Sequence, residues 1–404
     1  MVIEGESVKI FATIPLPSKI HEREMDKTDI PGTFNAGATL GPVNETNMAR
    51  IWNKHKQSNT PLKRKVFVGM SGGVDSSVAA ALLKGKGYDI IGVFIRAYNL
   101  CDWQEERRCA LRAAAHLGIP LETLDLSREY EREVVERMLA GYARGRTPNP
   151  DIWCNRAIKF GALWDYARAQ GAQYIATGHY AENCDGELLM SADAEKDQTY
   201  FLWTLTRDDL AHVLFPIGAM TKQEVREKAR ELGLPNAQKK DSQGVCFIGE
   251  MDVKDFLASC IVVEEGRVLD ERGRVIGTHP GALLFTLGER HGFTVTEKSP
   301  HDEPFYVITK DMSANTITVS PTPLRSRGAV KEINLEEISW VNAPPEIGKT
   351  YYARLRHRAP LIPSNVRHSV SDILLTFSEP VLAAPGQSCV LYDGSVCLGG
   401  GIIT

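Results

Sequence analysis

The sequence lacks any apolar run near the roughly 18–20 residues that a helix needs to span a bilayer, which excludes a membrane-embedded protein. It also lacks the C-x-x-C spacing, so neither a zinc ribbon nor a thioredoxin-like motif is predicted. Its 8 cysteines in 404 residues are too sparse for a disulfide scaffold, and free thiols in a reducing compartment are expected. The net charge of −4 excludes a uniformly basic nucleic-acid coat but allows a local basic patch.

What the chain does contain is typical of a globular protein. Hydrophobic residues make up 43% and charged residues 24% of the sequence, which excludes a wholly disordered or fibrous protein. A length of 404 residues predicts two or three domains. Residues 1–62, rich in Gly, Pro, Asn and Thr, have neither a continuous apolar segment nor an Arg-rich, acid-poor composition. We therefore expect a poorly ordered extension without a targeting signal, and a cytoplasmic protein.

Expected strands and helices alternate from Lys65 onward. The apolar, β-branched run 65–70 has the pattern of a buried parallel strand, and a helix closed by glycine is expected over 78–87. Further strands are expected at 88–96, 121–126 and 172–178, and further helices at 104–117, 129–144 and 154–170. Such alternation is typical of right-handed βαβ units. The fold class predicted for residues 63–250 is therefore α/β, a doubly wound parallel-sheet domain.

The C-terminal part of the chain has a different pattern. Residues 266–277 (GRVLDERGRVIG) predict a hairpin with its turn at 270–273, within a small α+β linker domain that spans residues 251–322. From residue 323 to residue 404, short alternating segments are separated by turn signals such as Asp393-Gly394. This pattern predicts a small C-terminal β-barrel.

A string rich in glycine and serine follows the first expected strand. Two adjacent glycines allow the backbone to approach an anion, while the loop N–H groups and the following helix N-terminus carry partial positive charge toward it. The Walker pattern with its lysine is absent, so another class of phosphate site is predicted, in which Asp75 could hold a Mg²⁺. The predicted nucleotide-binding residues of the string are Gly69, Met70, Ser71, Gly72, Gly73, Val74, Asp75 and Ser76.

The string S-G-G-x-D-S at residues 71–76 resembles the pyrophosphate loop (PP-loop) of the N-type ATP pyrophosphatases. In that superfamily ATP adenylates a carbonyl or carboxyl oxygen and pyrophosphate is released. Its members include GMP synthetase, NAD synthetase and several tRNA-thiolating enzymes. The resemblance implies a PP-loop ATPase domain with ATP as cofactor, but the loop alone does not select one member.

Two cysteines lie in unusual surroundings. Pro148 and Pro150 keep the chain extended before a helix that should begin near Asp151, which places Asp151 and Cys154 on one face of its first turn. A thiol there should have a lowered pKa, whereas Asp151 is better suited to acid–base or positioning work. The alternative for Cys154, a buried structural cysteine, is disfavoured by its polar flanks. Cys246 lies between glycines after two lysines, which favour a thiolate or persulfide anion.

Together these segments closely resemble the tRNA-specific 2-thiouridylases. The matching segments, in family order, are GMSGGVDSS (69–77), GRTPNPDIWCN (145–155), ATGHY (176–180), KDQTYFL (196–202), KKDSQGVCFIGE (239–250), FTLGERHG (285–292) and PGQSCVLYDGSVCLGGGI (385–402). The resemblance covers nearly everything from Lys65 to the C-terminus. Residues 1–62 match nothing in that family.

The resemblance implies a specific reaction. ATP held by the loop would adenylate O2 of the wobble uridine in certain tRNAs. A persulfide on Cys246, loaded by a sulfur-relay protein or a cysteine desulfurase, would supply the sulfur. Cys154 would act as the partner nucleophile that liberates sulfide or closes a disulfide with Cys246, and AMP would leave as the thiocarbonyl forms.

The resemblance also assigns binding residues. Ile95 and Gly178 would line the nucleotide site. The implied tRNA contacts are Asn149, Pro150, Asp151, His179, Lys196, Asp197, Gln198, Arg356, His357 and Gln387. Arg354, Arg356 and Arg358 alternate, so in a strand they would share one face as a basic stripe. A solvated edge strand would explain the arginines alone equally well, and the resemblance favours the RNA surface.

Three alternatives stay open. Another ATP pyrophosphatase, such as an amidotransferase-type synthetase, would bring an ammonia source, and no glutaminase motif is found. Asp151, Cys154 and Cys246 could together hold an iron–sulfur cluster, since thiolates favour iron. An RNA-binding or sulfur-carrier protein with an inactive nucleotide site would tolerate the loss of Ser71 and Asp75.

Overall fold

The structure is a computed structural model that describes residues 4–5, 8–9, 64–97, 103–240, 253–296, 303–323, 328–368 and 373–404, all within one compact unit. The expected extension, residues 1–62, lies outside the described residues except for β1 (Glu4–Gly5) and β2 (Val8–Lys9), which pair antiparallel. Of the site residues predicted from the sequence, Cys246 is the one that falls outside the described part.

A five-stranded parallel sheet forms the centre of the N-terminal half of the chain. Its strand order is β5 (Leu121–Asp125), β4 (Asp89–Arg96), β3 (Lys65–Gly69), β6 (Tyr174–Ala176) and β9 (Val213–Leu214). All four pairings are parallel. The side chains of Val66, Phe67 and Val68 in β3 are fully buried, as expected for an apolar strand covered on both faces. The predicted parallel sheet is confirmed.

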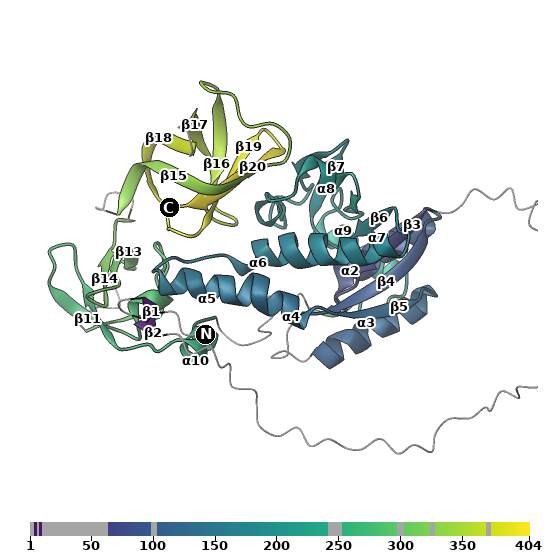
Figure 1. The fold of residues 1–404 in the computed structure, drawn as a ribbon, viewed down its shortest axis with the longest axis horizontal. Coiled ribbons are helices and arrows are strands. Elements are labelled where there is room, and N and C mark those ends of the chain that lie inside the picture. Colours follow the sequence, from purple (N-terminus) through teal and green to yellow (C-terminus); the bar gives the residue numbers. More distant parts are fainter. Residues whose placement is uncertain are drawn as a thin grey trace, which may run out of the picture. The chain divides into compact units, whose positions relative to one another are not determined.

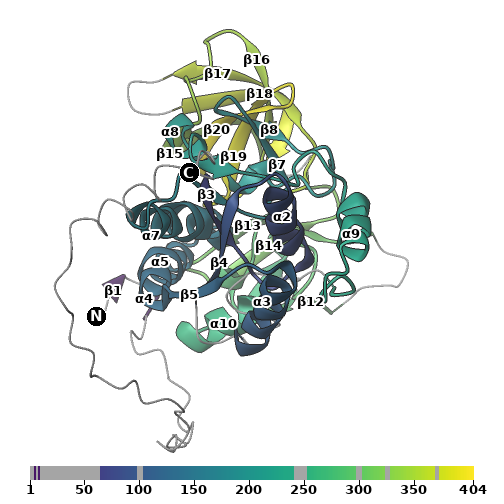
Figure 2. The same ribbon diagram turned by 90° about the vertical axis from the view of Figure 1, so that its right-hand side faces the viewer.

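Helices cover both faces of this sheet (Figure 2). On one face, α2 (Val74–Gly85) and α3 (Trp103–Leu117) pack against Val66. On the opposite face, Phe67 packs against α7 (Leu163–Ala169). Successive residues of β3 therefore point into two different cores, which is the doubly wound arrangement predicted from the sequence.

Two long helical segments connect β5 to β6, and both contain a π-helical stretch. The first consists of α4 (Ser127–Tyr130), the π-helical stretch Glu131–Val135 and α5 (Glu136–Ala143). The second consists of α6 (Pro150–Trp153), the π-helical stretch Cys154–Ala162 and α7. Proline suits the first position of α6 because the N–H that it lacks would have no partner within the helix. No helix in the described part of the chain has the length and apolar character required to cross a membrane.

Short elements complete the N-terminal half. They are β7 (Ala181–Cys184), β8 (Glu187–Met190), a 3₁₀ turn (Thr199–Phe201), α8 (Arg207–Leu210) and α9 (Lys222–Glu231). Thr206 and Thr221 form capping boxes with acidic residues three positions later, which explains where α8 and α9 begin.

The middle of the chain forms a small sheet preceded by one helix, α10 (Val253–Cys260). The strand order is β12 (Thr294–Val295), β11 (Val275–His279), β10 (Gly266–Leu269), β14 (Thr316–Ser320) and β13 (Tyr306–Asp311), with a 3₁₀ turn at Ala282–Leu284. β10 and β11 pair antiparallel, and the Asp270 carboxylate accepts the backbone N–H groups of Arg272 and Arg274 in their turn. The predicted hairpin and the α+β character are both confirmed.

Six antiparallel strands close into a C-terminal barrel, drawn in green to yellow in Figure 1. In spatial order they are β15 (Ala329–Trp340), β18 (Ile373–Leu382), β17 (Ile362–His368), β16 (Thr350–Arg354), β19 (Ser388–Asp393) and β20 (Val396–Ile403). β20 pairs back with β15, which closes the ring and removes its free edges. β20 also pairs with β8, so the β7–β8 hairpin continues the barrel sheet. The predicted barrel is confirmed.

Gly400 tests how closely the barrel strands pack. A Cβ at Gly400 would lie 2.2 Å from the carbonyl oxygen of Cys389 on the paired strand β19, and backbone at that distance must shift. We expect Gly400→Ala to lower the melting temperature by about 5 °C or more in scanning calorimetry. Gly85→Ala is the control, because a Cβ there meets nothing within 4 Å, and alanine favours the end of α2 by about 0.5–1 kcal/mol. Equal melting temperatures for the two variants would contradict the packing described.

Candidate active site

The predicted phosphate loop joins β3 to α2 at the carboxyl end of the central strand. Gly72 has φ +82°, a conformation that L-residues rarely adopt, and a Cβ there would lie 2.3 Å from the carbonyl oxygen of Glu106. Gly73 is the N-cap of α2, and no side chain caps the helix at this position. The first-turn N–H groups of α2 are therefore left for a ligand or water to satisfy, which suits an anion.

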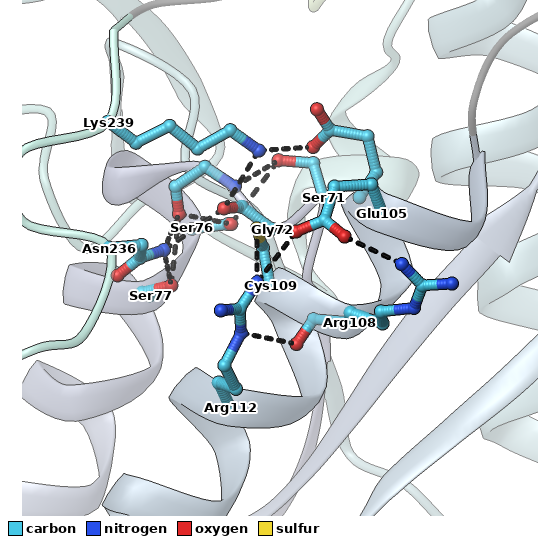
Figure 3. A network of polar contacts seen from close by, with 12 residues as sticks. Ser71, Gly72, Ser76, Ser77, Glu105, Arg108, Cys109, Arg112, Asn236 and Lys239 are labelled. Carbon is cyan, nitrogen blue, oxygen red and sulfur yellow. Dashed lines mark hydrogen bonds and ion pairs between the residues drawn. The ribbon is translucent and has the colours of Figure 1, made fainter.

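A network of hydrogen bonds fixes the loop through its backbone carbonyl groups (Figure 3). Asn236 is only 6% exposed, and its Nδ2 donates to the carbonyl oxygens of Gly72 and Gly73 and to Ser77 Oγ, each at 3.0 Å. The hydroxyl groups of Ser76 and Ser77 also donate to the Gly73 carbonyl, at 3.3 and 2.9 Å. Because the carbonyl groups are tied on one side of the loop, its N–H groups are presented on the other.

The carboxylate of Asp75 is already bound within the protein. Nζ of Lys222, the first residue of α9, donates to both Asp75 oxygens at 2.8 and 2.9 Å, and the Tyr180 hydroxyl donates to the same carboxylate at 3.0 Å. A Mg²⁺ on Asp75, as the sequence suggested, would have to displace an ammonium group. The contacts present therefore do not fit a cation at this carboxylate.

A second lysine reaches the loop from the same stretch of chain. Lys239 Nζ pairs with Glu106 at 2.6 Å and lies 3.5 Å from the carbonyl oxygen of Gly72 (Figure 3). The sequence analysis did not identify Asn236 or Lys222, and it considered Lys239 only for its effect on Cys246, which lies outside the described residues. In the sequence, the pair Lys239-Lys240 was the one feature that could have indicated a lysine near the phosphate loop. The phosphate loop therefore obtains its cations from outside its own string.

The other predicted nucleotide residues flank the loop. Gly178 follows β6 and packs so closely that a Cβ there would lie 2.6 Å from the backbone nitrogen of Ser76. Met70 and Val74 are buried, so only their backbone can face a ligand. Ile95, near the end of β4, is half-buried. The carboxyl ends of β3, β4 and β6 share one edge of the sheet, which is where ligands bind in such folds.

Cys154 is buried, contrary to the expectation from its polar flanks. It is 3% exposed and belongs to an apolar cluster with Ile158, against which Ile95 also packs. The helix begins at Pro150, so the thiol lies one turn inside it and not at its N-terminus. The neighbouring Trp153 ring lies under a guanidinium, with Cζ of Arg137 3.5 Å from the ring centroid. The polar residues beside Cys154 in the sequence therefore led to a wrong prediction of its exposure.

Asp151 occupies the first turn of α6, where Asn149 Oδ1 caps the helix by accepting the Asp151 N–H at 3.0 Å. Burial raises the pKa of the Asp151 carboxyl above its ordinary value, and the positive charge of Lys159 opposes the shift. Arg156 donates to the carbonyl oxygen of Thr204 at 2.7 Å. Asp151 therefore holds a proton more readily than an exposed aspartate does, which suits an acid–base role.

Two of the predicted tRNA contacts have buried side chains. The Asp197 carboxylate is 3% exposed and accepts from Arg354 at 2.8 Å and from the Thr199 hydroxyl at 2.9 Å. His179 is 8% exposed, with Nδ1 2.7 Å from the Thr177 hydroxyl oxygen, and burial lowers its pKa well below 6.5. Both side chains are engaged inside the protein, and their contacts with tRNA stay predictions.

Other predicted tRNA contacts are more accessible. Lys196 lines a cavity of about 410 Å³ together with Arg354 and Arg358. Gln198 is half-buried, and its Oε1 accepts the backbone N–H of Tyr180 at 2.9 Å. Glu195 and Asp197 line the same cavity, and Arg354 is paired with Asp197, so Lys196 and Arg358 are the cations there that could face a phosphate group.

The predicted basic stripe does not form. β16 ends at Arg354, and Arg356 and Arg358 lie in the turn that follows, where Arg358 has φ +61°. Arg356 is exposed, whereas Arg354 turns inward. The His357 ring lies with its centroid 4.4 Å from that of Phe201, and burial lowers its pKa to about 4. The alternation in sequence gave a false prediction because the strand stops before the second arginine.

The remaining predicted contacts lie beside Asp151. Asn149 caps α6, and Pro150 is buried. Gln387, at the start of the barrel strand β19, donates from Nε2 to the carbonyl oxygen of Thr147 at 2.5 Å. The structure therefore brings Gln387 next to the predicted base-facing turn, although 240 residues separate Gln387 from Thr147 in the sequence.

The described cysteines form no disulfide with one another. Because Cys246 lies outside the described residues, the disulfide with Cys154 stays a prediction. Over the described ranges, no group of three or more His, Cys, Asp or Glu side chains is arranged to hold a metal ion. The iron–sulfur alternative also depends on Cys246 and is not tested by these residues.

Three family models match consecutive parts of the chain. They are described as a tRNA methyl transferase HUP domain (residues 64–250), a tRNA methyl transferase PRC-barrel domain (residues 254–321) and an aminomethyltransferase beta-barrel domain (residues 330–403). They follow one another without overlap from the PP-loop sheet to the barrel.

Curated relatives carry a more specific description. The tRNA-specific 2-thiouridylase MnmA of Thiobacillus denitrificans is 44% identical over 359 residues, which cover 85% of this chain and 100% of the relative. The protein of the same name from Pediococcus pentosaceus is 41% identical over 358 residues, covering 84% and 95%. That from Cupriavidus metallidurans is 43% identical over 357 residues, covering 84% and 99%.

Solved structures match a smaller part of the chain. A 4-thiouridine synthetase–RNA complex with bound ATP covers 47% of this chain and 46% of its own, at 22% identity and a TM-score of 0.33. The curated relatives, in contrast, are above 40% identity and are matched over nearly their whole length. On that basis the chain belongs to the tRNA-specific 2-thiouridylase family and is an enzyme of that family.

Proposed function

We propose that this protein uses ATP to replace O2 of the wobble uridine of tRNA with sulfur. Membership of its family makes it an enzyme that thiolates uridine in tRNA; the wobble position, the adenylation step and the persulfide are our proposals. The observation that carries the proposal is the uncapped first turn of α2, placed at the carboxyl edge of the sheet. Bound ATP supplies an adenylyl group, which converts a poor leaving oxygen into a good one.

The residues of the loop fit a triphosphate. The backbone N–H groups of the first turn of α2, beginning with Val74, and the hydroxyl groups of Ser71 and Ser76, whose Oγ atoms lie 3.4 Å apart, would bind its oxygens. Gly69, Met70 and Val74 would take part through their backbone, and Ile95 and Gly178 would border the nucleotide. Any Mg²⁺ would accompany the phosphates, since the Asp75 carboxylate is bound to Lys222.

The two thiols would carry the sulfur. A persulfide on Cys246, loaded by a relay protein or a cysteine desulfurase, would attack C2 with its outer sulfur, and AMP would leave. The Cys154 thiolate would then attack Cys246 Sγ. That step breaks the persulfide S–S bond, leaves its electron pair on the sulfur bound to C2 and forms the Cys154–Cys246 disulfide. An external thiol would reduce the disulfide.

The rest of the chain would bind tRNA. We propose a division into a PP-loop catalytic domain (63–250), a linker domain (251–322) and a tRNA-binding barrel (323–404). The proposed tRNA contacts remain those implied by the resemblance, with the exposed Arg356 and the cavity at Lys196 the most accessible of them. Methyl transfer, named in two of the family descriptions, would leave the paired cysteines without a role.

The two-thiol step predicts the behaviour of cysteine variants. Cys154→Ser and Cys246→Ser should each lower 2-thiouridine formation by about a hundredfold or more, while ATP still binds, because the thiols act after the nucleotide is in place. Mass spectrometry of nucleosides from the product tRNA measures this. Cys184→Ser, an exposed cysteine on β7, is the matched control and should keep its activity. Full activity in Cys154→Ser or Cys246→Ser would remove the mechanism, and iron in the anaerobically purified protein would favour a cluster.

The phosphate loop predicts a separation of adenylation from RNA binding. The double variant Ser71→Ala, Asp75→Ala should lose tRNA-dependent pyrophosphate release by about a hundredfold, because the Ser71 hydroxyl is removed and Lys222 loses the carboxylate that holds it beside the loop. Its affinity for tRNA, measured by filter binding, should remain. Ser313→Ala, in an exposed turn of the middle sheet, is the control. Unchanged pyrophosphate release in the double variant would contradict the assignment of the loop.

The raised pKa of Asp151 predicts a pH-dependent stability. A carboxyl whose pKa is raised by folding contributes stability below its unfolded pKa, near 3.8, and loses that contribution as pH rises through the folded pKa. Asp151→Asn cannot ionise, so its melting temperature should rise relative to the wild type between about pH 4 and pH 7. Asp165→Asn, an exposed carboxylate on α7, should show no such trend. If the melting temperatures of Asp151→Asn and the wild type differ by the same amount at every pH, the Asp151 carboxyl is not in an apolar environment.

A further inference from the structure

Residues 385–388 of the barrel lie against the chain just before Asn149, Pro150 and Asp151, three of the implied tRNA contacts. The carbonyl oxygen of Pro385 accepts the backbone N–H of Thr147 at 2.9 Å, and Gln387 Nε2 donates to the Thr147 carbonyl at 2.5 Å. Both polar groups of the Thr147 backbone are therefore satisfied from the barrel. Thr147 is 6% exposed, so these bonds replace water that is not available there.

The barrel side of this contact is fixed by its own backbone. Gly386 has φ +90°, and a Cβ there would lie 2.7 Å from the Thr147 nitrogen. The N–H of Gly386 donates to the carbonyl oxygen of Ile403 at 2.8 Å, and the N–H of Ile403 donates to the Gln387 carbonyl at 2.8 Å. The Gln387 side chain therefore projects from a segment that is tied to the last barrel strand.

The barrel residue Ser388 contacts the segment 200–203, which in turn contacts Asn155. The Tyr200 hydroxyl donates to the Ser388 carbonyl at 2.9 Å, and Trp203 Nε1 donates to the Ser388 hydroxyl at 3.0 Å. Between these two aromatic residues, the carbonyl oxygen of Phe201 accepts from Asn155 Nδ2 at 3.0 Å. Asn155 directly follows Cys154. The barrel segment therefore contacts the thiol-bearing turn directly at Thr147, before Asn149, and indirectly through residues 200–203 at Asn155, after Cys154.

A separate ion pair supports the same arrangement. Arg146, next to Thr147, pairs with Glu336 on β15 of the barrel. Arg137, which covers the Trp153 ring, pairs with Glu337, the next residue of that strand. Glu336 and Glu337 of the barrel thus form ion pairs with residues in and next to the helices that carry the site.

We propose that the barrel segment 385–388 positions the turn from Asn149 to Cys154 for reaction, with Gln387 as its main side-chain contact. Gln387 is a positioning residue that acts through Thr147, in addition to any contact that it makes with tRNA. The proposal rests on the proposed function, because it is the chemistry at this turn that the contact serves. Displacement of a reacting group by a fraction of an ångström is enough to slow a reaction substantially.

The test separates binding from chemistry in the full-length protein. Gln387→Met keeps the side-chain volume but removes the donor to Thr147. We expect the single-turnover rate of pyrophosphate release at saturating tRNA to fall about tenfold, while the Kd for tRNA in filter binding changes less than about twofold. Hydrogen exchange of the peptide covering 147–155 should become faster. Gln387→Glu, which places an acceptor opposite the Thr147 carbonyl, should behave in the same way and serves if Gln387→Met does not fold.

The control is Arg168→Met on the exposed side of α7, which should match the wild type in all three measurements. A weaker Kd with an unchanged rate at saturation would make Gln387 a tRNA contact only and overturn the proposal. Unchanged hydrogen exchange at 147–155 would overturn it as well. If the wild type releases no pyrophosphate with tRNA, the proposed function fails instead, and the exchange measurement still decides whether Gln387 holds the turn.

Discussion

The direction of two backbone carbonyl groups, those of Gly72 and Gly73, determines what the parallel-sheet half of this protein can bind. A peptide unit presents its N–H and its C=O on opposite sides, so carbonyls tied to Asn236 leave the N–H groups for an anion. The turn requires a glycine at position 72, because the φ of +82° is unfavourable for other residues and a Cβ there would collide with the Glu106 carbonyl group. The helix that follows adds its partial charge, and Lys222 and Lys239 bring the cations that the loop lacks.

Local patterns in the sequence predicted much of this fold and of the nucleotide site. The run 65–70 predicted a buried strand, and the glycine-serine string predicted a turn into a helix, because both depend on residues close together in the chain. Asn236 and Lys222 were not predicted. Their partners lie 164 and 147 residues away, and neither residue belongs to a pattern that spacing alone would reveal. The burial of Cys154 was not predicted for the same reason: it depends on elements distant in the sequence that pack against the helix.

The failed arginine stripe illustrates a different limit. Alternation assigns side chains to a face only while a strand continues, and β16 ends at Arg354. Arg354 then enters a buried ion pair with Asp197, 157 residues away, over the ring of Tyr392 at 5.1 Å. Removing one partner of such a pair commonly costs about 3–5 kcal/mol, because the other charge is left buried. The Arg354 guanidinium, which was predicted to face RNA, is thus part of the contact between the barrel and residues 196–202.

That contact makes the barrel more than an added RNA-binding module. Strand β20 pairs with β8, and Val390, Tyr392 and Cys397 share one apolar core with Tyr200 and Trp203. A core of this kind resists relative motion, because interiors are close-packed and deform at high cost. If the barrel binds tRNA as proposed, a displacement of the barrel would therefore also displace the segment around Phe201, whose carbonyl oxygen accepts from Asn155. By linkage, if the arrangement of the thiol-bearing turn influences tRNA affinity, bound tRNA must favour that arrangement to the same extent. Because the barrel shares a core and a sheet with the half of the chain that carries Cys154, the proposed RNA binding and the proposed sulfur transfer would depend on one structural element.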